Sequence, residues 1–248
     1  MAKPTVVLPE IKVAKVSSLF DLLPSPTSSA RPLTFEDLNQ AYGFVLYRTQ
    51  IEGGKSGMLK VSGLKDYALI YINGKRVAIL DRRLKQDSVM VNLPKGEVWL
   101  EILVENLGRI NFGPYLLQNK KGITDKVSFD GAEVKNWKMF GLPLDHTPKT
   151  QVKVASNVSD APVIKTGVFN LNKLADTYLD MSDWGKGIVW INGNNLGRYW
   201  AIGPQQTLYV PAEWLKKGSN RIVVLELIKT EQSIVKTTKY PVLDRIQN

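Results

Sequence analysis

Aromatic and basic side chains gather in one stretch of this sequence, where they could bind a sugar. Gly197-Arg-Tyr-Trp200 follows an Asn-Gly dipeptide at positions 192–193. Aromatic rings stack on the apolar C–H faces of a sugar, and a guanidinium group donates hydrogen bonds to its hydroxyls. A groove of this kind would be lined by Trp184, Trp190, Arg198, Trp200 and Gln205. The alternative, which we favour, is that Trp200 packs inward, in the core or at an interface of a β-sandwich.

The acidic residues do not form a recognisable pair for the hydrolysis of a glycosidic bond. Glycosidases place two carboxylates on either side of that bond, roughly 5–10 Å apart. We expect Glu101 and Glu105 to project from the same side of one strand, and Glu226 to alternate outward from another. We therefore predict no catalytic residue in this chain.

Metal and cofactor sites are largely excluded by composition. His146 is the only histidine, and there is no cysteine. Histidine-rich and thiolate metal sites, disulfides and a cysteine nucleophile are therefore ruled out, whereas calcium bound by carboxylates alone stays open. The sequence also contains no nucleophile elbow, phosphate-binding loop or dinucleotide fingerprint. We expect neither a metal nor a cofactor.

One unit of strand, Asn-Gly turn and strand occurs twice. Residues 59–74 align with residues 179–193 with one residue gained or lost, and each copy ends in Ile-Asn-Gly. Asn-Gly supplies the positive φ angles of a two-residue hairpin turn. Each turn is followed by a Pro and Lys-Gly corner and an apolar strand. A spacing of about 120 residues is too long for a solenoid and predicts two homologous β-domains.

Composition and charge limit which kinds of partner the chain can have. The 248 residues are 44% hydrophobic and 23% charged, with a formal net charge of +10. Lys and Arg are spread among the acids and not interleaved with aromatics in a basic run, so we expect no nucleic-acid partner. No window approaches 18 apolar residues, so we expect no membrane span. The first residues lack the apolar core and cleavage site of an intact signal peptide.

Short strands separated by turn residues predict an all-β protein made of two tandem jelly-roll β-sandwiches. We expect an N-terminal arm and linker at 1–30, a first sandwich at 31–133 and a second at 134–248. In the arm, Ile11 and Val13 alternate with lysine, in the period of a half-buried strand. The Pro/Ser-rich stretch at 22–32 has too little apolar content to fold alone.

Several of these stretches resemble one family. Residues 180–200, followed by Gly203-Pro-Gln-Gln-Thr-Leu-Tyr-Val-Pro211, strongly resemble the C-terminal domain of the family 35 glycoside hydrolases, the β-galactosidases. Residues 42–49 and 103–113 resemble the preceding all-β domain of the same enzymes. The resemblance covers about residues 10–230 and implies that the second sandwich is galactose-binding-like.

In that family both domains follow a (β/α)₈ barrel that holds two catalytic glutamates, and these 248 residues contain no such barrel. The resemblance therefore implies non-catalytic domains that support a barrel and its substrate entrance. Two alternatives remain: a free-standing module that binds galactosides, and a subunit that completes a hydrolase with a barrel on a separate chain.

The resemblance also implies the roles of two segments. The loop after Asn106-Leu-Gly-Arg109 is expected to face the barrel through Arg109, Asn111, Phe112 and Tyr115. The family often has tyrosine where this chain has Phe112, so a hydroxyl contact would be lost there. The arm at 6–16 is expected to add a strand to the second domain, because the linker is long enough to span the first. A periplasmic or secreted location is compatible with the family.

Overall fold

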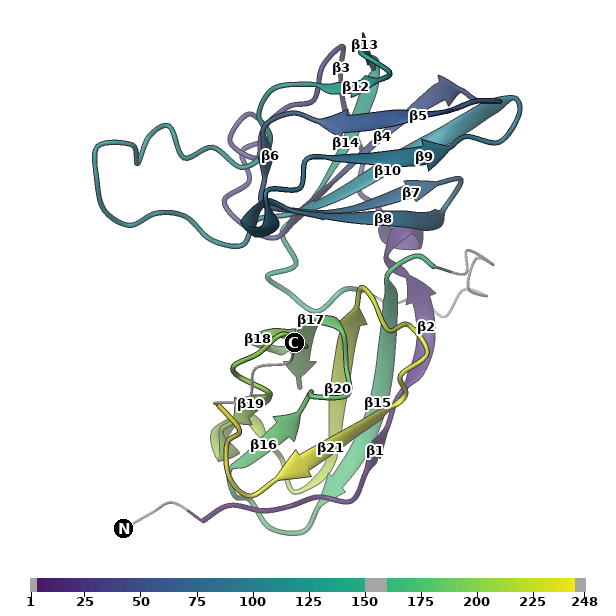
Figure 1. Cartoon of the computed structure of the whole chain (residues 1–248). Coiled ribbons are helices and arrows are strands. Elements are labelled where there is room, and N and C mark those ends of the chain that lie inside the picture. The colour runs from purple at the N-terminus through teal and green to yellow at the C-terminus, as the bar shows by residue number, and fades with distance from the viewer. Residues whose placement is uncertain (1–3, 150–159, 244–248) are drawn as a thin grey trace. The chain divides into compact units, whose positions relative to one another are not determined.

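A computed structural model describes residues 4–149 and 160–243 (Figure 1). Its regular structure is β-strand apart from three short 3₁₀ turns at Leu19–Leu22, Arg82–Leu84 and Ala212–Trp214. The chain divides into two compact units. The first domain contains residues 23–144, and the second combines the residues up to Leu22 with those from Asp145 onward. Across the described ranges, no helix is long and apolar enough to cross a membrane.

The first domain is a sandwich of two antiparallel sheets. Its larger sheet has the strand order β3-β14-β4-β10-β7-β8, formed by Thr27–Ser29, Trp137–Leu142, Phe44–Glu52, Glu97–Glu105, Tyr67–Ile72 and Lys75–Asp81. The smaller sheet has the order β13-β12-β5-β9, formed by Ala132–Glu133, Val127–Phe129, Ser56–Val61 and Ser88–Asn92. A short pair, β6 (Leu64–Lys65) and β11 (Gly122–Ile123), closes one end.

The core of the first domain lies between these two sheets. Strand β4 sends Val45 and Tyr47 inward, and β5 sends Leu59 and Val61 to meet them. These side chains alternate along their strands, because successive residues of a strand point to opposite faces. Tyr47 keeps its hydroxyl satisfied by donating to the carbonyl of Leu33 at 2.8 Å. The expected β-sandwich is therefore present.

The second domain is also a two-sheet sandwich. Its larger sheet has the order β18-β17-β20-β15-β2, formed by Asn194–Trp200, Lys186–Ile191, Gly218–Glu226, Val163–Leu171 and Ala14–Ser18. The smaller has the order β1-β21-β16-β19, formed by Ile11–Lys12, Ile234–Thr238, Thr177–Asp180 and Thr207–Val210. The two predicted Asn-Gly turns, one in each domain, have positive φ at both residues, as a type I′ turn requires.

The N-terminal arm belongs to both sheets of the second domain. Strand β1 pairs with β21, with Ile11 opposite Val235, and β2 pairs with β15. Ile11 and Val13 are buried in the core of this domain. Lys12, between them, is exposed. Burial therefore alternates along the arm with the same period of two as the apolar residues in the sequence.

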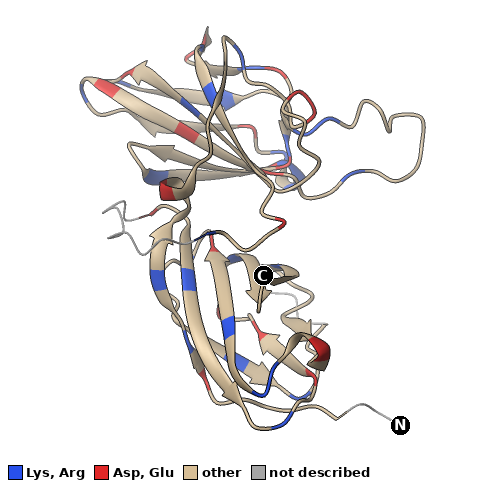
Figure 2. Cartoon of the chain, turned by 180° about the vertical axis from the view of Figure 1, so that it is seen from behind, with Lys and Arg blue, Asp and Glu red and all other residues tan. Residues whose placement is uncertain are grey.

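The domain boundaries differ from those expected at 31 and 133. Residues 137–142 form β14, which pairs with β4 from Lys138 opposite Arg48 to Leu142 opposite Phe44. These hydrogen bonds place the strand in the first domain, so the boundary falls at 144. Thr27–Ser29, expected in the linker, forms β3 on the outer edge of the same sheet. Lys and Arg are spread over both domains, with Asp and Glu between them (Figure 2).

Candidate functional site

Two of the predicted sugar-binding residues are inaccessible. Trp184 and Trp190 both have 0% of their surface exposed. Trp184 donates from Nε1 to the carbonyl of Ile234 at 3.1 Å, and its ring meets Tyr199 edge-on. Trp190 lies between Val189 and Ile191, which are buried too. A buried ring cannot stack on a sugar, so neither tryptophan lines a groove.

The other three predicted sugar-binding residues are not brought together around a shared cavity. Arg198 is exposed on β18. Trp200, at the end of that strand, is partly exposed and holds the Lys186 ammonium 3.7 Å from its ring centroid. Gln205 lies beyond the Gly203-Pro204 bond and faces a separate groove that contains Tyr178 and Tyr209. The five residues therefore do not form the groove that the sequence suggested.

The candidate carboxylates for hydrolysis are buried and bonded. Glu226, expected to face outward, is fully buried. It accepts hydrogen bonds from the backbone amides of Gly185, Ile228 and Lys229 at 2.7–3.0 Å, and from the Tyr199 hydroxyl at 2.9 Å. Burial raises the pKa of that hydroxyl well above its ordinary value. Glu226 thus joins the ends of strands and has no access to a substrate.

Glu101 and Glu105 are likewise buried. Glu101 forms an ion pair of 2.6 Å with Arg48 on the neighbouring strand, directly opposite in register. Among the residues that the structure describes, no group of three or more His, Asp or Glu side chains is placed to hold a metal ion.

An exposed loop of the first domain is the most unusual surface feature of the described chain. It connects β10 to β11 through residues 106–121 and extends away from the sandwich (Figure 1). Phe112 and Leu117 are 89% and 92% exposed. Further large apolar side chains stand in solvent beside them in sequence, namely Ile110, Tyr115 and Leu116. Exposed apolar side chains in such number mark interaction sites.

The base of this loop is held by polar contacts. Arg109 donates to the carbonyl of Ala41 at 2.9 Å and to that of Asn119 at 3.2 Å, and it pairs with the carboxylate of Glu36. Asn106 donates to the same Ala41 carbonyl and accepts from the Gly108 amide. Arg109, which the resemblance directs toward a barrel, closes the base of its own loop through these contacts. Asn111, Phe112 and Tyr115 are exposed.

Electrostatics reinforce this closure. Burial acts to raise the pKa of Glu36, but hydrogen bonds from the Lys121 amide and from Arg109 outweigh it, and the pKa is lowered. Glu36 is therefore a carboxylate at neutral pH. Beside it, a cavity of about 490 Å³ is lined by Arg82, Lys121 and Asp66, among others. Asp66 pairs with the Lys121 ammonium at 2.6 Å and with Arg82 at 3.0 Å, so one carboxylate is shared between two cations beside the loop base.

Comparison with known families matches both domains. Residues 32–144 match the family described as "Beta-galactosidase, first all-beta domain", and residues 162–220 match "Beta-galactosidase, galactose-binding domain". The first match covers the first domain from residue 32 to its end, including β14.

Individual relatives carry related names. A β-galactosidase of Xanthomonas manihotis is 38% identical over 206 residues, which are 83% of this chain and 34% of the relative. Beta-galactosidase-1-like protein 3 of Rattus norvegicus is 34% identical over an alignment that covers 97% of this chain and 40% of the relative. The chain thus spans about a third to two fifths of the length of these relatives.

Proposed function

Since the chain belongs to the β-galactosidase family, of which it carries the first all-beta domain and the galactose-binding domain, we propose that it supports a catalytic (β/α)₈ barrel and its substrate entrance. The hydrolysis itself is assigned to the barrel, because Glu101 and Glu226 are buried and bonded. The observation that carries this proposal is the exposed apolar loop at 106–121.

The loop is built like a docking element. Its apolar side chains stand in water, while its base is fixed by Arg109 and Asn106. A loop of this length without regular structure is uncommon in a compact domain unless it has a function. Burying a side chain as large as Phe112 or Leu117 contributes about 1.5–3 kcal/mol. A fixed base lowers the entropy that docking would cost, so more of this energy is left for binding.

The barrel is the partner that best fits the loop. The relatives are more than twice as long as the chain's match to them, so much of each relative lies outside these two domains. The resemblance directs the loop at Asn111, Phe112 and Tyr115 toward the barrel, and these three side chains are exposed. A barrel in the same protein or on a separate chain would use the same loop. A free-standing galactoside module at the five predicted residues is not supported, because two of them are buried.

Association with a barrel tests the proposal. The chain is mixed with the catalytic barrel of a β-galactosidase relative, and binding is measured by calorimetry and light scattering. The double variant Phe112→Ser/Leu117→Ser should weaken binding at least tenfold. Met58→Ser/Met90→Ser is the matched control, because these exposed residues form a cross-strand pair on the other sheet of the same domain. The control should bind like the wild type.

The readout separates docking from folding. Both double variants change exposed residues, so each substitution should change the free energy of unfolding by no more than about 0.5 kcal/mol. The proposal is wrong if the wild-type chain does not bind the barrel, or if the loop variant and the control variant bind it with equal affinity.

A further inference from the structure

A second surface feature lies on the second domain, apart from the Trp200 stretch and the buried carboxylates. It is an open groove of about 950 Å³. Two of its tyrosines face each other on adjacent strands, Tyr178 on β16 and Tyr209 on β19. Their ring centroids are 5.4 Å apart, with planes tilted by 47°. The next pair in register, Leu179 and Leu208, enters the core, so the tyrosines lie on the outer face of the sheet.

The Tyr209 ring is held in place from below. Its hydroxyl donates to the Asp176 carboxylate at 2.6 Å, and that carboxylate also accepts from the Ala212 amide at 2.8 Å. Asp176 is only 4% exposed. The hydrogen bond fixes the far edge of a ring that lines the groove, so little side-chain entropy is left to lose on stacking.

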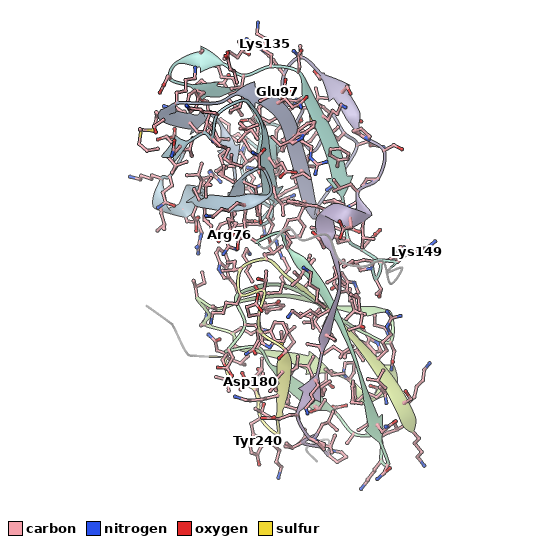
Figure 3. All side chains as sticks on the ribbon, turned by 90° about the vertical axis from the view of Figure 1, so that its right-hand side faces the viewer. Arg76, Glu97, Lys135, Lys149, Asp180 and Tyr240 are labelled. Atoms are coloured by element: carbon pink, nitrogen blue, oxygen red, sulfur yellow. The ribbon has the colours of Figure 1, made fainter. Side chains whose placement is uncertain are left out.

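The walls of the groove come from both ends of the described chain. The segment after β21 is pinned to β19, because the Gln206 amide donates to the Val242 carbonyl at 2.8 Å and the Val242 amide to Thr207 Oγ1 at 3.0 Å. This pinning presents Tyr240, which is 68% exposed (Figure 3). On the other side, the Val6 amide of the arm donates to the Asp176 carbonyl at 2.8 Å.

Polar groups are distributed among these rings. Lys239 lies with its ammonium 5.4 Å from the Tyr240 ring centroid. Gln205, which donates to the Thr207 carbonyl at 2.8 Å, lines the groove beside Tyr209. The groove therefore combines three aromatic faces with an ammonium, an amide and phenolic hydroxyls. A single lysine is a weak basis for an anion site, and the Asp176 carboxylate that lines the same groove opposes an anion.

We infer that this groove binds a carbohydrate chain, with Tyr209 and Tyr240 stacking on sugar rings while Lys239 and Gln205 bond to hydroxyls. A sugar ring has apolar C–H faces and a polar rim, and the groove offers both complements. Its volume is in the range of small-ligand sites. Of the five sugar-binding residues suggested by the sequence, only Gln205 belongs to it. The site needs no catalytic barrel, so it goes beyond the proposed function.

Affinity electrophoresis of the intact chain tests the site. Gels containing galactan, arabinogalactan or xyloglucan should retard the wild type with at least one of these polysaccharides. Tyr240→Ala should weaken that retardation at least tenfold. Tyr115→Ala is the matched control, because it removes an equally exposed tyrosine from the loop of the first domain and should leave the retardation unchanged.

A second variant guards against a folding artefact. Tyr209→Ala removes the hydrogen bond to buried Asp176, so its fold is checked by circular dichroism before its retardation is measured. Tyr240 is exposed, and its removal tests the site without that risk. Lack of retardation of the wild type in all three gels overturns the inference, as does retardation of Tyr240→Ala equal to that of the control. Tyr115→Ala also separates the two proposals, because it affects barrel docking and leaves sugar binding intact.

Discussion

The ammonium of Lys186 lies 3.7 Å from the centroid of the Trp200 ring, and Lys186 is only 2% exposed. The charge of a buried lysine needs compensation, and the face of an indole supplies part of it. Trp200 is therefore a packing residue whose partly exposed ring covers a buried cation. This contact favours the inward-packing interpretation, and the stability of a Trp200 variant tests it.

Replacing this ring should destabilise the second domain. We expect Trp200→Ala to lower its free energy of unfolding by about 2–4 kcal/mol, from a lost cation–π contact and lost packing. Trp200→Phe keeps an aromatic face and should cost less than half as much. Urea denaturation followed by circular dichroism measures both. A Trp200→Ala chain that is as stable as its parent but has lost galactoside binding would instead identify a sugar platform at Trp200.

The arm should stabilise the second domain selectively. Ile11 is buried opposite Val235, so Ile11→Ala should cost about 2–5 kcal/mol. Lys12→Ala, next to it on the exposed side, should stay within about 0.5 kcal/mol. Calorimetry should show the melting of the second domain lowered and that of the first unchanged. An arm that can be cut away at residue 20 without any change in the melting profile would contradict this.

The chain alone should not hydrolyse aryl β-galactosides. Glu226 is saturated by backbone amides and the Tyr199 hydroxyl, and Glu101 is paired with Arg48. Neither can act as an acid or a nucleophile on a bound substrate. Release of nitrophenol from an aryl galactoside is the assay. Turnover that disappears on replacing one of these glutamates would show that the assignment is wrong.

Ionisation of Tyr209 should be displaced to high pH. The hydrogen bond to the Asp176 carboxylate raises the pKa of Tyr209 to about 12, above the ordinary value of about 10. A raised pKa in the folded state stabilises the fold fully below pH 10 and loses this effect as the pH rises from 10 to 12. A pH titration followed by tyrosinate absorbance should therefore show a step near pH 12 in the wild type that is missing in Tyr209→Phe. An identical titration curve in both proteins would contradict the bond.

Sequence patterns predicted the sandwiches, and they failed where both faces of a strand are buried. Val189, Trp190 and Ile191 are all fully covered, so a period of two could not show that Trp190 lacks solvent. The burial of Glu226 was missed for the same reason. Its strand ends inside a cluster of backbone amides that lie up to 41 residues away in sequence. The misplaced boundary at 133 has another cause: β14, at 137–142, pairs with β4, far earlier in the chain, and a local pattern carries no information on which sheet a strand joins.

The groove tyrosines left a weak signal that sequence reasoning missed. Tyr178 and Tyr209 each alternate with leucines that enter the core, which predicts outward rings. Their pairing across 31 residues of chain depends on tertiary structure, as does the pinning of Tyr240. The resemblance singled out the loop that follows Asn106-Leu-Gly-Arg109, and its approach to a barrel stays a prediction. The contacts that Arg109 makes within the first domain were not predicted. Its contacts with Ala41 and Glu36 come from segments about 70 residues earlier.

The arm also sets an order for folding during synthesis. The Leu8 amide donates to Thr237 Oγ1, 229 residues later in the chain. When β1 and β2 leave the ribosome, their partners β21 and β15 have not been made, whereas residues 23–144 contain all the strands of the first domain. Domains fold as units as they emerge. The first domain is therefore complete while the arm is still unpaired, and the second domain closes only when the last strand has been translated.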